Sequence, residues 1–150
     1  MTPSMAAFQS AIIIDRSLED VFAVLSDPER TATWSSLTTG ETMISTGPIG
    51  VGSTYRAVGR GFGRPTVREN EVTEYELNRR WTVRSRTGSP ATRASATFHP
   101  VEGGTRIDFT VEAELTGPLR VVAPLVMTIG KRQWDRDLRN LKALMEAGRL

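Results

Sequence analysis

The sequence predicts an α+β domain in which a curved, seven-stranded antiparallel sheet wraps around one long C-terminal helix. From residue 40 to residue 115, segments that alternate apolar and polar residues follow one another, separated by short turns rich in Gly and Pro. After Gly117 the spacing of apolar residues changes from two to about 3.6, which indicates an amphipathic helix. A first strand and two short helices precede the alternating segments.

The N-terminal elements are predicted from composition and capping signals. β-branched and apolar residues gather in residues 8–15, which predicts the first strand. Ser17 suits the N-cap of a helix over residues 18–26. An Asp-Pro pair then suits the start of a second short helix that ends near Trp34. We interpret the two helices as a V-shaped lid whose Trp34 side chain turns inward.

Short turns between the remaining strands indicate an antiparallel meander. The last strand has the clearest period of two, since Ile107 and Phe109 alternate with Arg106 and Asp108. One face of the sheet is therefore expected to be buried and the other exposed to solvent. The six strands are expected at about residues 40–46, 52–59, 66–76, 80–86, 92–100 and 105–115.

The closing helix is expected over residues 117–148, restarted or kinked at Pro124 and ended by Gly148. Because one helix is only about 10–12 Å wide, it cannot fill the concavity of a sheet of this width. Either large side chains fill the remaining space or a cavity is left. The apolar stripe assigned to the helix is Val122, Val126 and Ile129, continued by Trp134, Leu138, Leu141 and Met145.

Composition limits the class of protein. The 150 residues, 39% of them hydrophobic, suit a single domain over residues 1–150, with residues 1–6 as a flexible N-terminus. No run approaches the roughly 20 apolar residues of a transmembrane helix, so no stable membrane insertion is expected. The absence of cysteine and of a secretion signal fits a cytoplasmic location. A net charge of +2 without a basic patch interleaved with aromatics does not indicate a nucleic-acid partner.

No motif for a metal, a nucleotide or a catalytic nucleophile is present in the sequence. We therefore expect no cofactor and no metal. His99 is the single histidine and precedes a proline at a strand end, which is poor evidence for catalysis or metal binding.

Four segments in this order resemble the START-like superfamily, also called SRPBCC or polyketide cyclase/dehydrase-like. They are "VFAVLSDPERTATW", "VGSTYRAVG", "FHPVEGGTRIDFTVE" and "RQWDRDLRNLKALME", and the resemblance covers about residues 8–148. It implies a helix-grip fold with a deep pocket between the sheet and the last helix. Members of this superfamily include aromatic polyketide cyclases, lipid carriers, plant hormone receptors and Hsp90-activator-like domains, so the fold alone does not fix the function.

Candidate ligand contacts follow from strand parity and from the implied pocket. For Tyr55, Trp81, Phe98 and Phe109 a purely structural role in the core stays open, because core and cavity wall share one face. The same holds for Trp34, as a plug between lid and sheet, and for Gln133, as a locally bonded side chain. The candidates are Trp34, Tyr55, Glu71, Trp81, Phe98, Phe109, Val122, Val126, Ile129 and Gln133.

Glu69 and Glu71 share one face of their strand. If that face points inward, a buried carboxyl with a raised pKa could serve as a general acid or base, and if outward both are solvent charges. Arg68 has the opposite parity. The cyclases that this chain resembles carry an inward Arg, and we assign none here, which counts against a cyclase.

The sequence therefore favours binding of a hydrophobic small molecule such as a lipid, a polyketide or an aromatic metabolite. The alternative is an enzyme of the cyclase/dehydratase kind that uses acid and base groups in the pocket. A third reading is an interaction module that uses the basic last helix. The oligomeric state stays open, a homodimer included.

Overall fold

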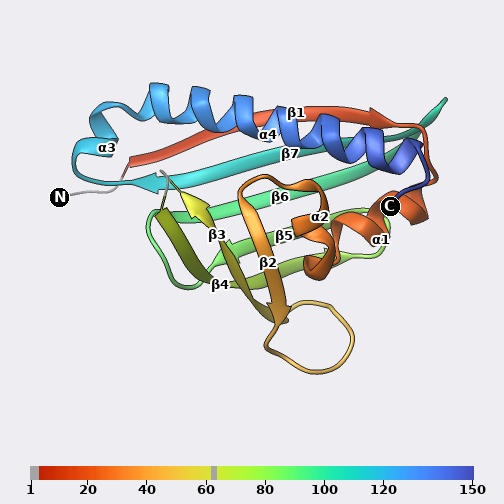
Figure 1. Ribbon diagram of the computed structural model, residues 1–150, viewed down its shortest axis with the longest axis horizontal. Coiled ribbons are helices and arrows are strands. Elements are labelled where there is room, and N and C mark those ends of the chain that lie inside the picture. Colours follow the sequence, from red (N-terminus) through yellow and green to blue (C-terminus); the bar gives the residue numbers. More distant parts are fainter. Residues whose placement is uncertain (1–3, 62–63) are drawn as a thin grey trace.

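The sheet contains seven antiparallel strands, and its order places the first strand beside the last. The computed structural model of this protein describes residues 4–61 and 64–150. Neighbouring strands follow the order β1-β7-β6-β5-β4-β3-β2, which confirms the predicted meander (Figure 1). The strands are β1 (Ser4–Ile14), β2 (Thr38–Met43), β3 (Thr54–Gly61), β4 (Arg64–Glu76), β5 (Arg80–Ser85), β6 (Ala91–Val101) and β7 (Gly104–Leu115).

β1 begins earlier than the sequence predicts. The expectation of a flexible N-terminus is wrong for residues 4–6, because Ser4 lies opposite Leu115 and Ala6 opposite Ala113 in the β1–β7 ladder. β7 extends to Leu115, and its backbone groups are satisfied when β1 continues alongside them. Residues 1–3 lie outside the described residues.

The two capping signals act as predicted. The Ser17 hydroxyl accepts a hydrogen bond from the Asp20 N–H at 3.2 Å, and the Asp27 carboxylate accepts one from the Glu29 N–H at 3.0 Å. These caps begin the two helical segments, and the second segment ends at Trp34 as expected. The elements are α1 (Leu18–Leu25), the 3-10 helix η1 (Pro28–Arg30) and α2 (Thr31–Trp34).

The C-terminal helix restarts where proline requires it. Pro124 lies in the first turn of the long segment, which divides the predicted helix into α3 (Pro118–Val121) and α4 (Ala123–Glu146). At the other end Gly148 has a φ of +72°. Its N–H donates to the Met145 carbonyl at 3.0 Å, while the Arg149 N–H donates to the Leu144 carbonyl at 2.8 Å. This is the Schellman ending that the glycine predicts.

α4 turns only part of its predicted stripe toward the sheet. Leu138, Leu141 and Met145 are buried as expected, but Val122 and Ile129 are 42% and 57% exposed. At 100° per residue the set at 122, 126 and 129 lies roughly 120° around the helix from the set that begins at 134, so one stripe could not contain both. α4 also approaches β1 at Gly130, where an added Cβ would lie 3.6 Å from the Phe8 ring.

The hydrophobic core is divided between two groups of side chains. The larger core joins α1 and the second half of α4 to β1, β6 and β7. The smaller core consists of Tyr55, Val72 and Val83 on β3, β4 and β5, with partly buried neighbours. Figure 1 shows α4 running along β1 and β7, while α2 lies beside β2. The predicted fold class is thus confirmed. Among the helices in the described part of the chain, none combines the length and apolarity needed to cross a membrane.

Candidate functional site

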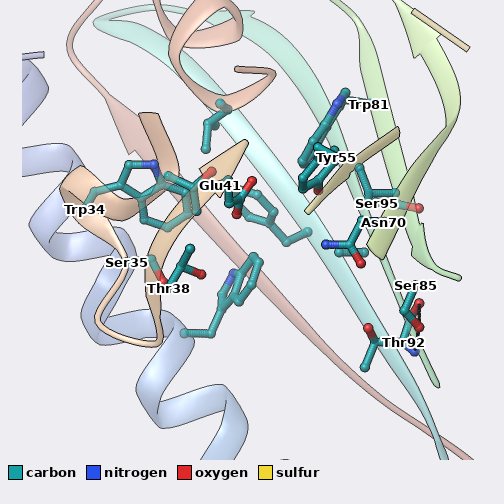
Figure 2. Close-up of a pocket in the computed structure, with 17 residues that line it drawn as sticks. Trp34, Ser35, Thr38, Glu41, Tyr55, Asn70, Trp81, Ser85, Thr92 and Ser95 are labelled. Carbon is teal, nitrogen blue, oxygen red and sulfur yellow. Dashed lines mark hydrogen bonds between the residues drawn. The ribbon is translucent and has the colours of Figure 1, made fainter. Parts of the chain in front are cut away.

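A cavity of about 180 Å³ lies between the two cores, under the lid and beside α4. Its apolar wall includes Leu25 from α1 and Val83, Ala94, Ala96 and Phe109 from three strands. Polar side chains from β2 to β5 lie opposite α2 and α4 (Figure 2). Of the two outcomes expected from the sequence, large side chains that fill the space or a cavity, the structure shows a cavity.

Aromatic side chains make up much of the wall. Of the ten candidate residues, Trp34, Tyr55, Trp81 and Phe109 lie on it, and Trp134 from α4 joins them. The indole N–H groups of all three tryptophans are buried without a hydrogen-bond partner. Contact of these residues with a ligand stays a prediction, but the place of Tyr55, Trp81 and Phe109 on the cavity wall follows from the strand parity that suggested them.

Glu41 is one of the residues of this wall that were not among the sequence candidates, and it carries the only carboxyl group of the described wall. It lies on β2, and although the residue is partly exposed, its Oε2 is fully buried and has no hydrogen-bond partner. Burial raises the pKa of Glu41 from its ordinary 4.5 to about 8; a hydrogen bond with Thr31 opposes this shift and the Asp27 carboxylate adds to it. Glu41 is therefore largely a neutral acid at pH 7.

Tyr55 is the diagonal neighbour of Glu41 across two paired strands. Glu41 lies opposite Ala57 and Tyr55 opposite Met43 in the β2–β3 ladder, so Glu41 and Tyr55 share one face of the sheet. Burial and the nearby Glu41 raise the pKa of the Tyr55 phenol well above its usual range, against a hydrogen bond with Asn70. Figure 2 shows the Glu41 carboxyl between the Trp34 and Tyr55 side chains in that view.

The structure decides between the two directions that the sequence left open for the Glu69 and Glu71 face of β4. Asn70 lines the cavity, so Arg68 has the inward parity and Glu69 and Glu71 the outward one. Glu71 forms an ion pair with Arg84 across β4 and β5, with 2.8 Å between Oε1 and Nη2. The prediction that Glu71 lines the pocket is wrong, because Glu71 lies on the outward face of β4, where it pairs with Arg84.

Arg68 supplies the inward arginine that we did not assign. Its Nη1 donates to the Pro90 carbonyl at 2.8 Å and lies 3.4 Å from the Thr92 hydroxyl, and Thr92 lines the cavity. The guanidinium itself is not on the wall. We counted the absence of an inward arginine against a cyclase, and that argument fails because Arg68 lies on the inward face of β4. Its guanidinium, however, is hydrogen-bonded to the β5–β6 connection.

Five further candidates do not reach the cavity. Phe98 belongs to the larger core, where its ring centroid lies 5.0 Å from that of Phe22. Val122, Val126 and Ile129 lie on the part of α4 that turns away, for the helical reason given above, and are absent from the wall. Gln133 also lies off the wall, and its amide donates to Asp137 one turn along α4 and to Ser36 after α2.

Gln133, Asp137 and Asn140 form what we call the α4 latch, since they recur at helical spacing and hold the end of the lid. The buried Asp137 carboxylate accepts hydrogen bonds from the Ser36 N–H at 3.2 Å and from the Gln133 amide at 3.3 Å. The Asn140 amide donates to the Trp34 carbonyl at 3.1 Å. The latch fixes the backbone from which Trp34 enters the cavity.

His99 lies away from this site. Its Nε2 is 3.4 Å from the Asp108 carboxylate, and both side chains are about half exposed. Within residues 4–61 and 64–150, no three His, Asp or Glu side chains gather as a metal site would require. The arrangement in the cavity can thus bind an apolar molecule, exchange a proton at Glu41 and donate hydrogen bonds.

Comparison with known proteins identifies relatives over almost the whole chain. The family model described as "Polyketide cyclase / dehydrase and lipid transport" matches residues 5–146. Uncharacterised proteins of Mycobacterium tuberculosis and Mycobacterium bovis are 28% identical over 146 residues, which span 93% of this chain and 84% of theirs.

Solved structures share the fold at low identity. A START superfamily protein from Mycobacterium smegmatis has a TM-score of 0.82 at 16% identity, covering 95% of this chain and 98% of that one. The di-domain ARO/CYC protein BexL from the BE-7585A biosynthetic pathway has a TM-score of 0.74 at 15% identity. That match covers 93% of this chain but 49% of BexL. These two likenesses establish the fold.

Proposed function

Because this chain belongs to the polyketide cyclase/dehydrase and lipid transport family, we propose that it binds a small, largely hydrophobic molecule in the cavity between the sheet and α4. The observation that carries this proposal is a cavity of about 180 Å³ with apolar and aromatic walls and an unpartnered carboxyl oxygen inside. Apolar pockets with a few oriented polar groups are the usual form of small-molecule sites.

Intrinsic fluorescence gives a direct test, since all three tryptophans of the chain line the cavity. Titration with a solvatochromic dye, followed by displacement with a panel of aromatic metabolites, polyketides and fatty acids, should shift the tryptophan emission. The dye should be released as the displacing ligand fills the cavity. Absence of both dye binding and any emission change across the panel would contradict the proposal.

A second candidate function is acid–base catalysis of the cyclase or dehydratase type. The observation that favours it is Glu41, a buried acid with a pKa of about 8 beside Tyr55 on a cavity wall. An acid with a pKa near the working pH is suited to give and take protons in the transition state. Its role would be to protonate a carbonyl or hydroxyl oxygen of the substrate.

Product analysis separates this candidate from simple binding. The purified protein would be incubated with a poly-β-keto substrate, and the products compared with those of Glu41→Gln. Catalysis by Glu41 predicts a changed product pattern with the wild type and loss of that change in the variant. Identical product patterns with wild type, variant and no protein would leave binding alone.

A further inference from the structure

The titratable side chains of the cavity wall are all of one sign. Its described wall contains one acid, Glu41, and no Lys, Arg or His. A second acid, Asp27, lies close enough to raise the Glu41 pKa further. The Asp27 carboxylate is paired with Arg30 at 3.3 Å, so that cation is engaged outside the cavity. The described wall therefore contains one group that can become negatively charged, Glu41, and no positively charged side chain.

The charged groups around Glu41 in the described part of the chain also include no cation directed at its carboxyl. From η1 and its cap they are Asp27, with the exposed Glu29 and Arg30 beyond it, and from α2 only the uncharged Thr31. From β3 Tyr55 faces it, whereas Arg56 and Arg60 have the outward parity and are exposed. Across the sheet, Arg68 is turned to the Pro90 carbonyl.

The aromatic groups around Glu41 suit a cation as well. Trp34, Trp81, Trp134, Tyr55 and Phe109 all lie on the wall. The faces of aromatic rings attract cations, and tryptophan does so most strongly, with about 2 kcal/mol or more when the site is dry. Binding a neutral ligand would not need the Glu41 carboxyl, because Tyr55, Asn70 and Ser85 on the wall already supply hydrogen-bonding groups. A carboxylate ligand would find no cationic side chain on the described wall to pair with.

From this geometry we propose that the cavity selects organic cations, a protonated or quaternary amine on a body of one or two rings, with Glu41 as the counter-ion. The body size follows from volume, since a cavity of about 150 Å³ accommodates benzene and this one measures about 180 Å³. This inference rests on the proposed binding function and names its ligand class. Fatty acids and other carboxylates should bind more weakly than the cation, because the described wall offers them no positively charged partner.

Proton linkage distinguishes a cation from other ligands. In the free protein Glu41 holds its proton up to about pH 8, so a cation that pairs with the carboxylate must displace that proton. Affinity for a permanent cation should then rise about tenfold per pH unit below pH 8 and level off above it. A neutral acceptor that takes a hydrogen bond from the protonated acid shows the opposite trend, with affinity lost above pH 8.

The experiment is isothermal titration calorimetry with benzyltrimethylammonium, benzyl alcohol and benzoate as probes. Repeating the cation titration at pH 7 in two buffers of different ionisation enthalpy should give close to one proton released per cation bound. The cation should bind best of the three. Glu41→Gln should weaken it at least tenfold at pH 8, while Glu102→Gln, the same change on the exposed β6–β7 turn, should leave it unaltered.

Trp34→Phe gives an independent check if Glu41→Gln folds poorly. Phenylalanine keeps the ring but attracts cations less than tryptophan, so the cation should weaken several-fold and benzyl alcohol should not. Tighter binding of benzyl alcohol or benzoate, or a cation affinity that does not change with pH, would overturn the inference and leave the binding function standing. Failure of all three probes and of the dye would overturn both.

Discussion

Glu41 combines two properties that rarely coincide in a stable core, a carboxyl oxygen without a partner and a place between packed aromatic rings. Burying an ionised carboxylate without compensation is costly, so the group retains its proton instead. The raised pKa of Glu41 is the direct consequence, and it links the stability of the empty protein to pH. A ligand cation would remove the same cost by a different route.

The stability of the protein should therefore depend on the Glu41 proton. The pKa of Glu41 is about 8 in the folded chain against 4.5 ordinarily, so the folded state binds the proton more tightly. Stability from this group is complete below about pH 4.5 and is lost as the pH rises to about 8, by up to about 1.4 kcal/mol per pH unit. Urea unfolding of wild type and Glu41→Gln across this range measures it.

The comparison with the variant isolates this one group. The pKa values of Asp135 and Glu146 are lowered in the folded protein, so their contributions are lost at lower pH and are common to both chains. The free energy of unfolding of Glu41→Gln should therefore increase relative to that of the wild type as the pH rises from about 4.5 to about 8. Two parallel curves would show that Glu41 ionises normally.

Trp34 belongs to the fold as much as to the cavity. It is 7% exposed and part of the larger core, so Trp34→Ala should lower the free energy of unfolding by about 3–5 kcal/mol. Trp34→Phe should cost clearly less, because the indole N–H has no partner to lose. Chemical denaturation of the two variants checks this, and a loss under about 1 kcal/mol in Trp34→Ala would assign Trp34 to the lid alone.

Which residues could be foreseen depended on how strong the local pattern was. Trp81 and Phe109 lie in strands with a regular period of two, so their inward direction followed from sequence. Glu41 lies in the short polar segment "TTGETM", where the only sign was that it shares parity with Met43. The partners that bury Glu41 come from η1, α2 and β3, and no local pattern predicts them.

At the scale of elements, β4 and α4 show where periodicity misleads. The register between β4 and β5 shifts between Val72 and Glu74, so one parity cannot describe the whole of β4, and its polar sequence gave no apolar reference. In α4, two short apolar sets looked continuous although they lie on different sides of the helix. Predicting the fold required only the type and order of the strands and helices, and these two errors change neither.

The α4 latch makes the position of the lid depend on one buried carboxylate. Asp137→Ala would leave the Ser36 N–H without its acceptor and remove one of the two acceptors of the Gln133 amide. We expect a loss of about 2 kcal/mol in the free energy of unfolding and faster hydrogen exchange in residues 34–37. Arg136→Ala, an exposed neighbour on the same helix, is the control. Unchanged exchange in residues 34–37 would mean that Trp34 holds the lid without the latch.

At the scale of the whole molecule, the cavity lies where two cores of unequal size meet. Ala96, Phe109 and Trp34 belong to the larger core, and Tyr55 and Val83 to the smaller, yet all five line the same cavity. Space between the cores removes packing contacts from both. The β2–β4 side therefore depends on a smaller core and on the partly buried Tyr75 and Trp81, which pack against both cores.

This asymmetry predicts that the two sides of the sheet open separately. Protein segments with fewer buried apolar contacts open at lower free energy than the global transition, so amides of β2 and β3 should exchange before those of β6 and β7. Val72→Ala, in the smaller core, should speed exchange mainly in β2–β4. Leu141→Ala, in the larger core, should cost about 2–5 kcal/mol and speed exchange throughout.

Native-state hydrogen exchange at low urea concentrations measures both variants against the wild type. If the cavity separates two cooperative units, Val72→Ala leaves the protection of β1 and β7 at the wild-type level while β2–β4 loses it. A ligand that fills the cavity restores contacts to both cores, so it should slow exchange in β2 and β3 most. Equal acceleration of every strand by Val72→Ala would show a single cooperative unit, in which the ligand stabilises all seven strands alike.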